Sequence, residues 1–199
     1  MYLKNMGKLL KHLKTIHTHR KYVRQMCFKM GIPWQGLVHD LSKYSISELL
    51  MCKYWTGTCS PHATCRELFG YSPSWMHHYH VNKHHWQYWI DAEDWPDKFI
   101  AAKMPYKYVI EMCCDQIGAS KAYNKDKFNV KMVWQYWVEK CEGKRLMHKE
   151  SEYLIKKLLW MYSELGEDKF VSWYKANKKT LKTMYNDNVL SLENAYVIS

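Results

Sequence analysis

The chain has 199 residues, of which 47% are hydrophobic, which suits one domain with its own core and excludes a disordered chain. Its formal net charge of +11, from 30 Lys and Arg against 19 Asp and Glu, favours an anionic partner such as a nucleotide, a nucleic acid or an anionic membrane surface. The basic residues are spread along the chain, so solvated helix faces explain the charge at least as well.

Cysteine usage and the N-terminal residues indicate a cytoplasmic protein. The seven cysteines are odd in number and lack the spacing of a disulfide framework, which favours reduced thiols. The first residues are rich in Lys and lack the apolar core of a signal peptide. No apolar run approaches the roughly 20 residues of a membrane span, so we expect no membrane partner.

The first part of the chain predicts helices separated by short breaks. Apolar residues recur at helical spacing over residues 3–30, and Gly31 and Pro33 end that segment. A short helix is expected over residues 34–41. The run Ser45-Ile46-Ser47-Glu48 is typical of the capped start of a helix, which we expect to reach residue 54.

A loop is expected next, because residues 56–71 are rich in Gly, Ser and Pro; it has room for one helical turn. Within it, the run Cys59-Ser60-Pro61-His62-Ala63-Thr64-Cys65, with Cys52 upstream, offers ligands for a small zinc site. The spacing matches none of the common zinc modules closely. Cys113-Cys114, in a later helical stretch, are interpreted as packing residues.

The rest of the chain also favours helices. Ser72-Pro73 opens a helix expected to reach residue 89, residues 91–104 are irregular, and Pro105 starts a helix to residue 123. Further helices are expected over residues 129–141, 149–165 and 168–185, followed by a loosely held tail over 186–199. The predicted fold class is therefore all-α, in one compact domain whose helices within residues 1–124 carry the site and whose residues 125–185 add C-terminal helices.

The most informative feature is the doublet His39-Asp40. His19 lies upstream on a predicted helix, five histidines lie between residues 77 and 85, and Asp115 follows on another predicted helix. Imidazoles and carboxylates that converge from separate helices are how a protein holds one or two divalent metal ions. We therefore expect a metal site that includes this doublet.

The histidine-rich segment is expected to supply two of the ligands. Positions seven apart nearly eclipse on a helix, so His78 and His85 share one predicted face, as do His77 and His84. Asn82 lies near the same side. Exposed histidines on a basic helix are the alternative interpretation.

Two further groups complete the candidate site. Glu111 and Asp115 are four residues apart on one helix face among apolar residues, and a buried carboxylate needs a partner, which is a metal or a lysine. Lys43 lies one helical turn past Asp40, where its cation could hold a phosphate oxygen; a solvated lysine is the alternative.

The order His19, His39-Asp40 with Lys43, paired histidines and Asp115 resembles the HD-domain metal-dependent phosphohydrolases, which are named for their His-Asp doublet. Three strings are similar to a nearer, uncharacterised family of bacteria and their phages, from which no function carries over: His39-Asp40-Leu41-Ser42-Lys43-Tyr44, Trp75-Met76-His77-His78 and Asn82-Lys83-His84-His85-Trp86. The resemblance covers residues 19 to 115, about half of the chain.

The resemblance implies an HD-domain-like helical fold with one or two divalent ions, of Mn, Fe, Mg, Co or Zn. The implied metal ligands are His19, His39, Asp40 and Asp115, with His78 and His85 completing a second site. His12 and His17 compete with His19 for the first position, and His77 and His84 compete with the downstream pair.

The implied activity is hydrolysis of a nucleotide or other small phosphate ester by a metal-activated water. Asp40 is the expected general base, and Lys43 and His84 are expected to neutralise charge on the phosphoryl oxygens. Lys43, Asn82 and Glu111 are the expected substrate-binding residues.

Two other functions stay open. The first is oxidation of a small organic molecule at a di-iron site of the HD type. The second is a module that binds a nucleotide or nucleic acid without turnover, in which aromatic residues such as those of Trp86-Gln87-Tyr88-Trp89 stack on bases. The C-terminal helices are expected either to cover the site or to form the interface of a homodimer.

Overall fold

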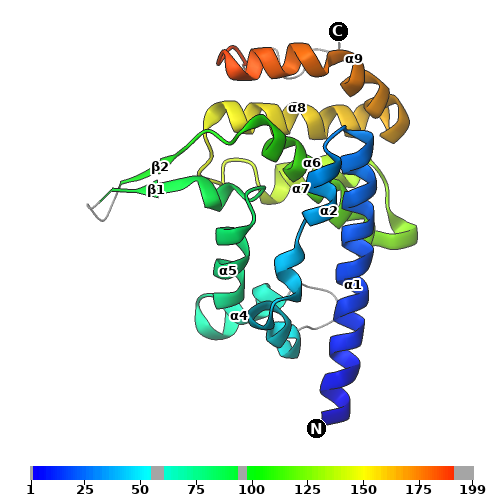
Figure 1. Cartoon of the computed structure of the whole chain (residues 1–199), viewed down its shortest axis with the longest axis vertical. Coiled ribbons are helices and arrows are strands. Elements are labelled where there is room, and N and C mark those ends of the chain that lie inside the picture. Colours follow the sequence, from blue (N-terminus) through cyan, green and yellow to red (C-terminus); the bar gives the residue numbers. More distant parts are fainter. Residues whose placement is uncertain (1, 55–60, 94–97, 191–199) are drawn as a thin grey trace.

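Helices make up most of the chain in the computed structural model, which describes residues 2–54, 61–93 and 98–190, with the side chains of 2–6 and 52 excepted (Figure 1). The α-helices are α1 (Tyr2–Lys29), α2 (Pro33–Val38), α3 (Ile46–Leu49), α4 (Pro61–Phe69), α5 (Pro73–Val81), α6 (Tyr106–Asn124), α7 (Lys131–Lys140), α8 (Lys149–Leu165) and α9 (Glu167–Asn186). Four 3-10 helices are η1 (Leu41–Tyr44), η2 (Leu50–Tyr54), η3 (Trp86–Trp89) and η4 (Lys125–Lys127). Strands β1 (Ile90–Ala92) and β2 (Phe99–Ala101) pair antiparallel.

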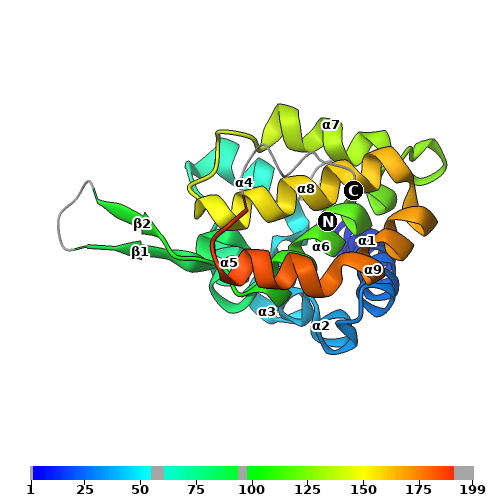
Figure 2. The ribbon, with the colours of Figure 1, turned by 90° about the horizontal axis from the view of Figure 1, so that it is seen from above.

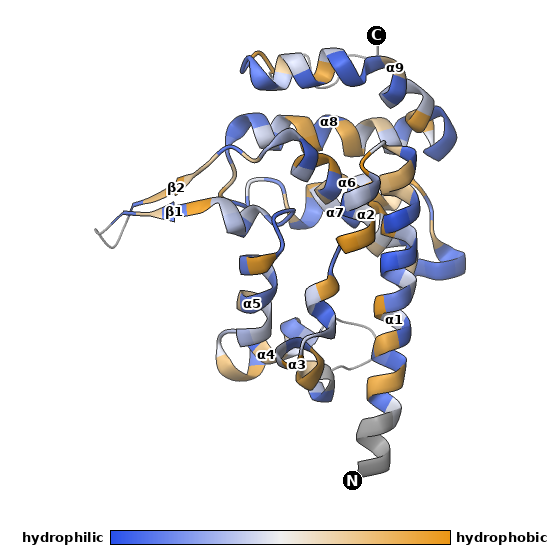
Figure 3. Ribbon diagram, in the orientation of Figure 1, coloured by the Kyte–Doolittle hydropathy of each residue, from blue (hydrophilic) through white to orange (hydrophobic). Residues whose placement is uncertain are grey.

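Helix α6 lies at the centre of the molecule, packed along α1 and covered by α8 and α9 (Figures 1 and 2). Gly118 lets α1 and α6 approach closely, because a Cβ there would lie 2.5 Å from Val23 Cγ2. The apolar core joins α6 to α8 and α9 through fully buried residues such as Ile110, Leu158 and Tyr174. Figure 3 shows hydrophobic residues alternating with hydrophilic ones along α1 and α8, as expected for helices with one buried face.

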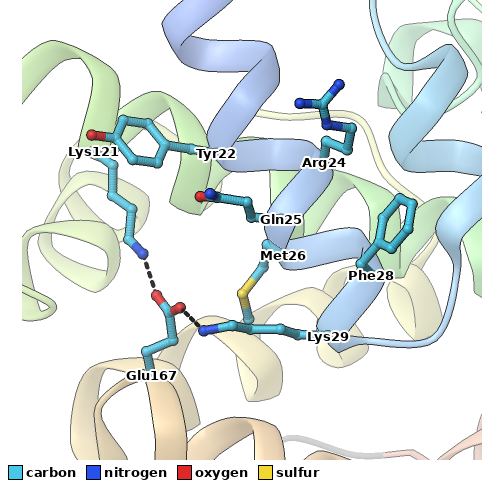
Figure 4. Close-up of a pocket in the computed structure, with 8 residues that line it drawn as sticks. All are labelled: Tyr22, Arg24, Gln25, Met26, Phe28, Lys29, Lys121 and Glu167. Carbon is cyan, nitrogen blue, oxygen red and sulfur yellow. Dashed lines mark hydrogen bonds and ion pairs between the residues drawn. The ribbon is translucent and has the colours of Figure 1, made fainter.

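The start of α9 is tied to both α1 and α6 by one carboxylate. Glu167 accepts from Lys29 Nζ at 2.5 Å and also pairs with Lys121 (Figure 4). These three residues border a pocket of about 450 Å³ whose other lining residues come mostly from α1. The pairing fixes the end of the α8–α9 turn against the helices that carry the site.

The predicted all-α class is confirmed in its coarse form, since the described chain is mostly helical with one small hairpin. The predicted helices over 3–30, 105–123, 129–141, 149–165 and 168–185 are present within a few residues of their expected ends. Cys113 and Cys114 are fully buried in the core, as their interpretation as packing residues required. No helix within the described ranges is long and apolar enough to cross a membrane.

Several local predictions were wrong. Residues 61–69 form α4 and not a loop, residues 90–92 and 99–101 form the hairpin within a segment expected to be irregular, and the helix expected over 34–41 ends at Val38. Leu190 is 4% exposed, so the chain beyond α9 stays packed at least to that residue; 191–199 lie outside the described residues. Cys59 and the side chain of Cys52 also lie outside them, so the proposed zinc module is untested.

Candidate metal centre

Asp40 stands between α2 and η1 in a left-handed backbone conformation, with φ 53° and ψ 28°. Aspartate tolerates this conformation better than most residues, and such strained positions gather at functional sites. Arg20 on α1 holds the turn, because its guanidinium donates to the carbonyl oxygens of His39 at 2.8 Å and Leu37 at 3.1 Å. The doublet is therefore fixed to α1 through the residue that follows His19.

A first cluster of ligand atoms surrounds one carboxylate oxygen of Asp40. His19 Nε2 and His39 Nε2 each lie 3.4 Å from Asp40 Oδ2. Asp115 Oδ1, on α6, lies 3.1 Å from His19 Nε2 and 3.4 Å from His39 Nε2. Three segments far apart in the sequence thus place four ligand groups around one point.

A second cluster surrounds the other oxygen. His78 Nε2 lies 3.3 Å from Asp40 Oδ1, and His84 Nε2 lies 3.5 Å from it. His85 joins this group, with its ring centroid 4.2 Å from that of His84 and 4.7 Å from that of His78. Asp40 therefore faces both clusters.

Two buried glutamates orient the imidazoles from behind. Glu111 Oε1 accepts from His39 Nδ1 at 3.0 Å and from His84 Nδ1 at 3.2 Å, and Glu48 Oε2 accepts from His78 Nδ1 at 2.9 Å. An ionised carboxylate only accepts, so each of these imidazoles donates from Nδ1, and its Nε2 atom faces Asp40. Metal-binding histidines are held in this way.

The donor set fits divalent metal ions. His84 Nε2 and His85 Nε2 are buried and make no hydrogen bond with any described residue. The nitrogen–oxygen distances within the two clusters run from 3.1 to 3.5 Å. Two atoms bound to one ion at bond lengths near 2.1 Å lie about 3.0–3.5 Å apart at tetrahedral or octahedral angles. The spacing therefore matches ligands that share an ion better than groups bonded directly to each other.

The charges in the clusters stabilise one another. Burial opposes the charged form of His39, but Asp40 and the other nearby carboxylates outweigh it and raise the pKa of His39 to about 10. Burial also opposes the charged form of Asp40, yet His39 and Lys43 hold the pKa of its carboxyl well below the usual range. Burial lowers the pKa of His85 well below its ordinary value, which keeps the imidazole in the neutral form that binds metals.

The clusters open into a cavity of about 180 Å³. Lys43 Nζ reaches this cavity and lies 2.6 Å from Asp40 Oδ2. His12 from α1 and His62 from α4 also line it; burial, followed by the charge of Lys43, lowers their pKa values to about 4 and about 3. At neutral pH, His12 and His62 are therefore neutral imidazoles near the lysine cation.

A family model matches residues 8–161, which is most of the chain. Its description is "Family of unknown function (DUF5662)". The chain belongs to this family. The region matched to DUF5662 contains both clusters and the two glutamates behind them, and it leaves α9 outside. Comparisons with curated proteins and with solved structures gave no match.

The structure brings together all six residues expected as ligands in this DUF5662 chain: His19, His39, Asp40, His78, His85 and Asp115. His17 is directed elsewhere, with Nδ1 3.3 Å from the Tyr44 hydroxyl, so His19 holds the first position. His77 is 39% exposed in its side chain and contacts Glu48 Oε1 at 3.0 Å. The geometry thus favours His19 over His17 for the first position, and His12 lines the cavity without belonging to either cluster.

The helix-face argument for the second cluster was wrong. Helix α5 ends at Val81, and His84 and His85 follow on a turn. Asn82 ends the helix, because its Nδ2 donates to the His78 carbonyl oxygen at 2.8 Å and to Ser42 Oγ at 2.7 Å. The turn brings His84 in beside His85, so both histidines offer ligand groups, whereas the sequence left His84 as a competitor for one ligand position.

Two residues expected to bind substrate have other contacts. The side chain of Asn82 is used in holding the turn to η1. Glu111 is 5% exposed and lies behind two imidazoles. Glu48 was missed, because Ser45-Ile46-Ser47-Glu48 was interpreted as a helix cap; Ser45 makes no side-chain cap, and Glu48 binds histidines instead.

Proposed function

We propose that the protein is a metal-dependent phosphohydrolase that cleaves the phosphate ester of a nucleotide or another small molecule. The observation that carries this proposal is the position of Asp40, which turns one carboxylate oxygen to each of two histidine clusters. Sites for two neighbouring ions suit in-line displacement at phosphorus, since both the attacking and the leaving oxygen can be stabilised.

The residues that would hold the ions form two sets that share Asp40. One set adds His19, His39 and Asp115, and the other adds His78, His84 and His85. Divalent ions bound there supply Lewis acidity toward phosphoryl oxygens and toward water. Because imidazoles dominate, the donors favour Mn, Fe, Co or Zn over Mg.

The chain's own groups supply the remaining chemistry. The carboxylate of Asp40 is the proposed acceptor for the proton that a water loses as it attacks phosphorus. The ammonium of Lys43, at the cavity wall, is proposed to bind a phosphoryl oxygen and to stabilise the charge that grows on it. The P–O bond to the alcohol would break, and the leaving oxygen would take up a proton from solvent or the one that Asp40 accepted.

Lys43 also favours this function over oxidation of a neutral organic molecule at a di-iron site. The ammonium of Lys43, partly exposed at the wall of the cavity, attracts an anionic ligand more strongly than a neutral one. A phosphate ester would provide that anion in addition to Asp40, and the net charge of +11 would attract it.

The test combines elemental analysis of the purified protein with a panel of nucleotides and bis(4-nitrophenyl) phosphate, assayed for hydrolysis with each divalent metal. We expect bound transition metal and release of phosphate or nitrophenol. Asp40→Ala should lose both the metal and the turnover, because it removes a ligand shared by the two clusters. Asp91→Ala, on exposed β1, is the matched control and should keep both.

Two results would contradict the proposal. If Asp40→Ala keeps its metal and full activity, the doublet has a structural role and not a catalytic one. Wild-type protein that carries iron, consumes dioxygen and hydrolyses no phosphate ester would favour the oxygenase instead. Circular dichroism on Asp40→Ala and on the milder variant Asp115→Asn separates loss of the site from loss of the fold.

A further inference from the structure

A second, larger cavity of about 700 Å³ adjoins the metal centre between α6, α7 and the segment around η3. Its volume is within the range of about 300–1,000 Å³ that is usual for small-molecule sites. The residues that line both cavities are Trp75, His85, Asp115, Ala119 and Tyr123. The larger cavity therefore begins where the two ligand clusters end, and a molecule whose phosphate lies at the clusters can extend into it.

The cavity contains amide groups that lack partners. Gln116, which follows Asp115 on α6, has both Nε2 and Oε1 buried, and neither atom makes a hydrogen bond within the described part of the chain. Gln87 Oε1, on η3, is also buried and makes no hydrogen bond with a described residue. A primary amide offers a donor and an acceptor side by side, and burying such groups unpaired is unfavourable. A ligand whose edge carries both an acceptor and a donor could make the hydrogen bonds that these amide atoms lack.

Aromatic side chains form the walls of the same cavity. Trp86 and Tyr136 line this cavity and not the smaller one, and Trp75 lines both. Tyr136 is 54% exposed, although it sits on a helix whose other face packs in the core. Aromatic faces of this kind stack on planar heterocycles.

We propose that this cavity binds the nucleobase of a nucleoside phosphate, with the Gln116 amide paired to the edge of the base and an aromatic ring against its face. The proposal rests on the phosphohydrolase function, because the clusters are taken to hold the phosphate. It narrows the substrate class from any small phosphate ester to nucleotides. A bare sugar phosphate would leave both amides unpaired.

Calorimetric titration with adenosine, guanosine, cytidine and uridine tests the cavity separately, because nucleosides carry no phosphate for the clusters. We expect wild-type protein to bind at least one of them. Gln116→Leu should weaken that binding about tenfold, since it removes two hydrogen bonds. Tyr136→Ala, at an exposed side chain that can be truncated without harm to the core, should weaken it by a similar factor. Gln25→Leu, exposed on α1 outside this cavity, is the matched control and should bind as wild type does.

The outcomes separate this inference from the proposed activity. Absence of nucleoside binding, or wild-type binding by both Gln116→Leu and Tyr136→Ala, would overturn the base-binding cavity. Release of phosphate from ribose 5-phosphate as fast as from nucleotides would also overturn it and would leave the phosphohydrolase intact. Nucleoside binding that depends on Gln116, without hydrolysis of any nucleotide, would support the cavity and contradict the phosphohydrolase.

Discussion

Lys43 and Asp40 lie 2.6 Å apart and yet have different proposed partners. Asp40 faces imidazole nitrogens on both sides, whereas the ammonium of Lys43 lies at the wall of the cavity. A residue that binds an ion and a residue that binds the substrate can be separated by measuring metal content and turnover independently.

For Lys43→Ala we expect turnover of the phosphate ester to fall by about 10²–10³, since one electrostatic contact to the transition state is removed. Metal content by elemental analysis should stay near that of wild type. Lys53→Ala, at an exposed lysine on η2, serves as the control and should leave both unchanged. Loss of metal in Lys43→Ala would show that the lysine stabilises the ion site and does not act by binding the substrate.

Glu111 contacts two imidazoles of the clusters, His39 and His84, and would act on bound ions through them. Glu111→Gln keeps the size of the side chain but removes its charge, so the imidazoles become weaker and less well oriented ligands. We expect the affinity for the metal to fall about 10- to 100-fold, as measured by competition with a chelator. The same change at exposed Glu67 on α4 should have no effect; an equal effect at both would show that Glu111 has no special role.

At the scale of elements, the contact between α1 and α6 sets the geometry of the first cluster. His19 lies one turn before Val23 on α1, and Asp115 lies three residues before Gly118 on α6. The close approach that Gly118 permits is thus next to the 3.1 Å contact between His19 and Asp115. Packing and site geometry depend on the same pair of helices.

Gly118→Ala should destabilise the protein. Alanine favours a helix over glycine by up to about 1 kcal/mol. The new Cβ would, however, lie 3.0 Å from the Val23 backbone nitrogen as well as 2.5 Å from Val23 Cγ2, and overpacking costs about 1–3 kcal/mol. Gly7→Ala on α1, where an added Cβ would meet nothing within 4 Å, should be neutral or stabilising. Urea unfolding of both variants measures the difference, and a stabilised Gly118→Ala would show that the helices can separate freely.

The attachment of α9 is expected to weaken in acid. Burial opposes the charge of Glu167, but hydrogen bonds from Lys121 and Lys29 outweigh it and lower the pKa of this carboxyl below its ordinary value of 4.5. A lowered pKa in the folded state stabilises the fold above that ordinary value, and the stabilisation is lost as the pH falls through the folded pKa. Glu167→Gln should therefore unfold more easily at pH 7 and lose less stability between pH 5 and pH 3 than wild type.

Thermal unfolding at several pH values measures this effect. Glu164→Gln is the control, because Glu164 forms an exposed pair with Lys131 on the neighbouring helices α7 and α8. Exposed pairs contribute little, so its stability should follow the wild-type pH curve. Parallel curves for wild type and Glu167→Gln would exclude a role for the Glu167 pairs in acid sensitivity.

At the scale of the whole molecule, the long helices and most residues of the two clusters could be predicted from the sequence, whereas the turns could not. Apolar spacing over residues 149–165 gave the bounds of α8 because the period of a helix is visible in one segment. The end of α5 could not be found in this way. It depends on a hydrogen bond from Asn82 to Ser42, a residue 40 positions away.

The outer groups of the site were harder to predict for the same reason. Glu48 and Glu111 are ordinary helix residues by local pattern, and only the tertiary fold brings them behind the histidines. The three-residue strands β1 and β2 were also missed, because so short a run carries too little alternation to be seen. The resemblance already grouped His19, His39, Asp40 and Asp115, whereas the place of His84 in the second cluster depends on the turn after α5.

The spread of the ligands along the chain has a consequence for assembly. His19, the doublet, the histidines of residues 78–85 and Asp115 belong to four segments, and all four must be in place before both clusters are complete. An ion bound by them would tie distant parts of the chain together as a reversible cross-link, in the manner of a disulfide that closes a long loop. Loading of the ion and completion of the fold would then be a single equilibrium, and the same atoms that serve the chemistry would also hold the chain closed.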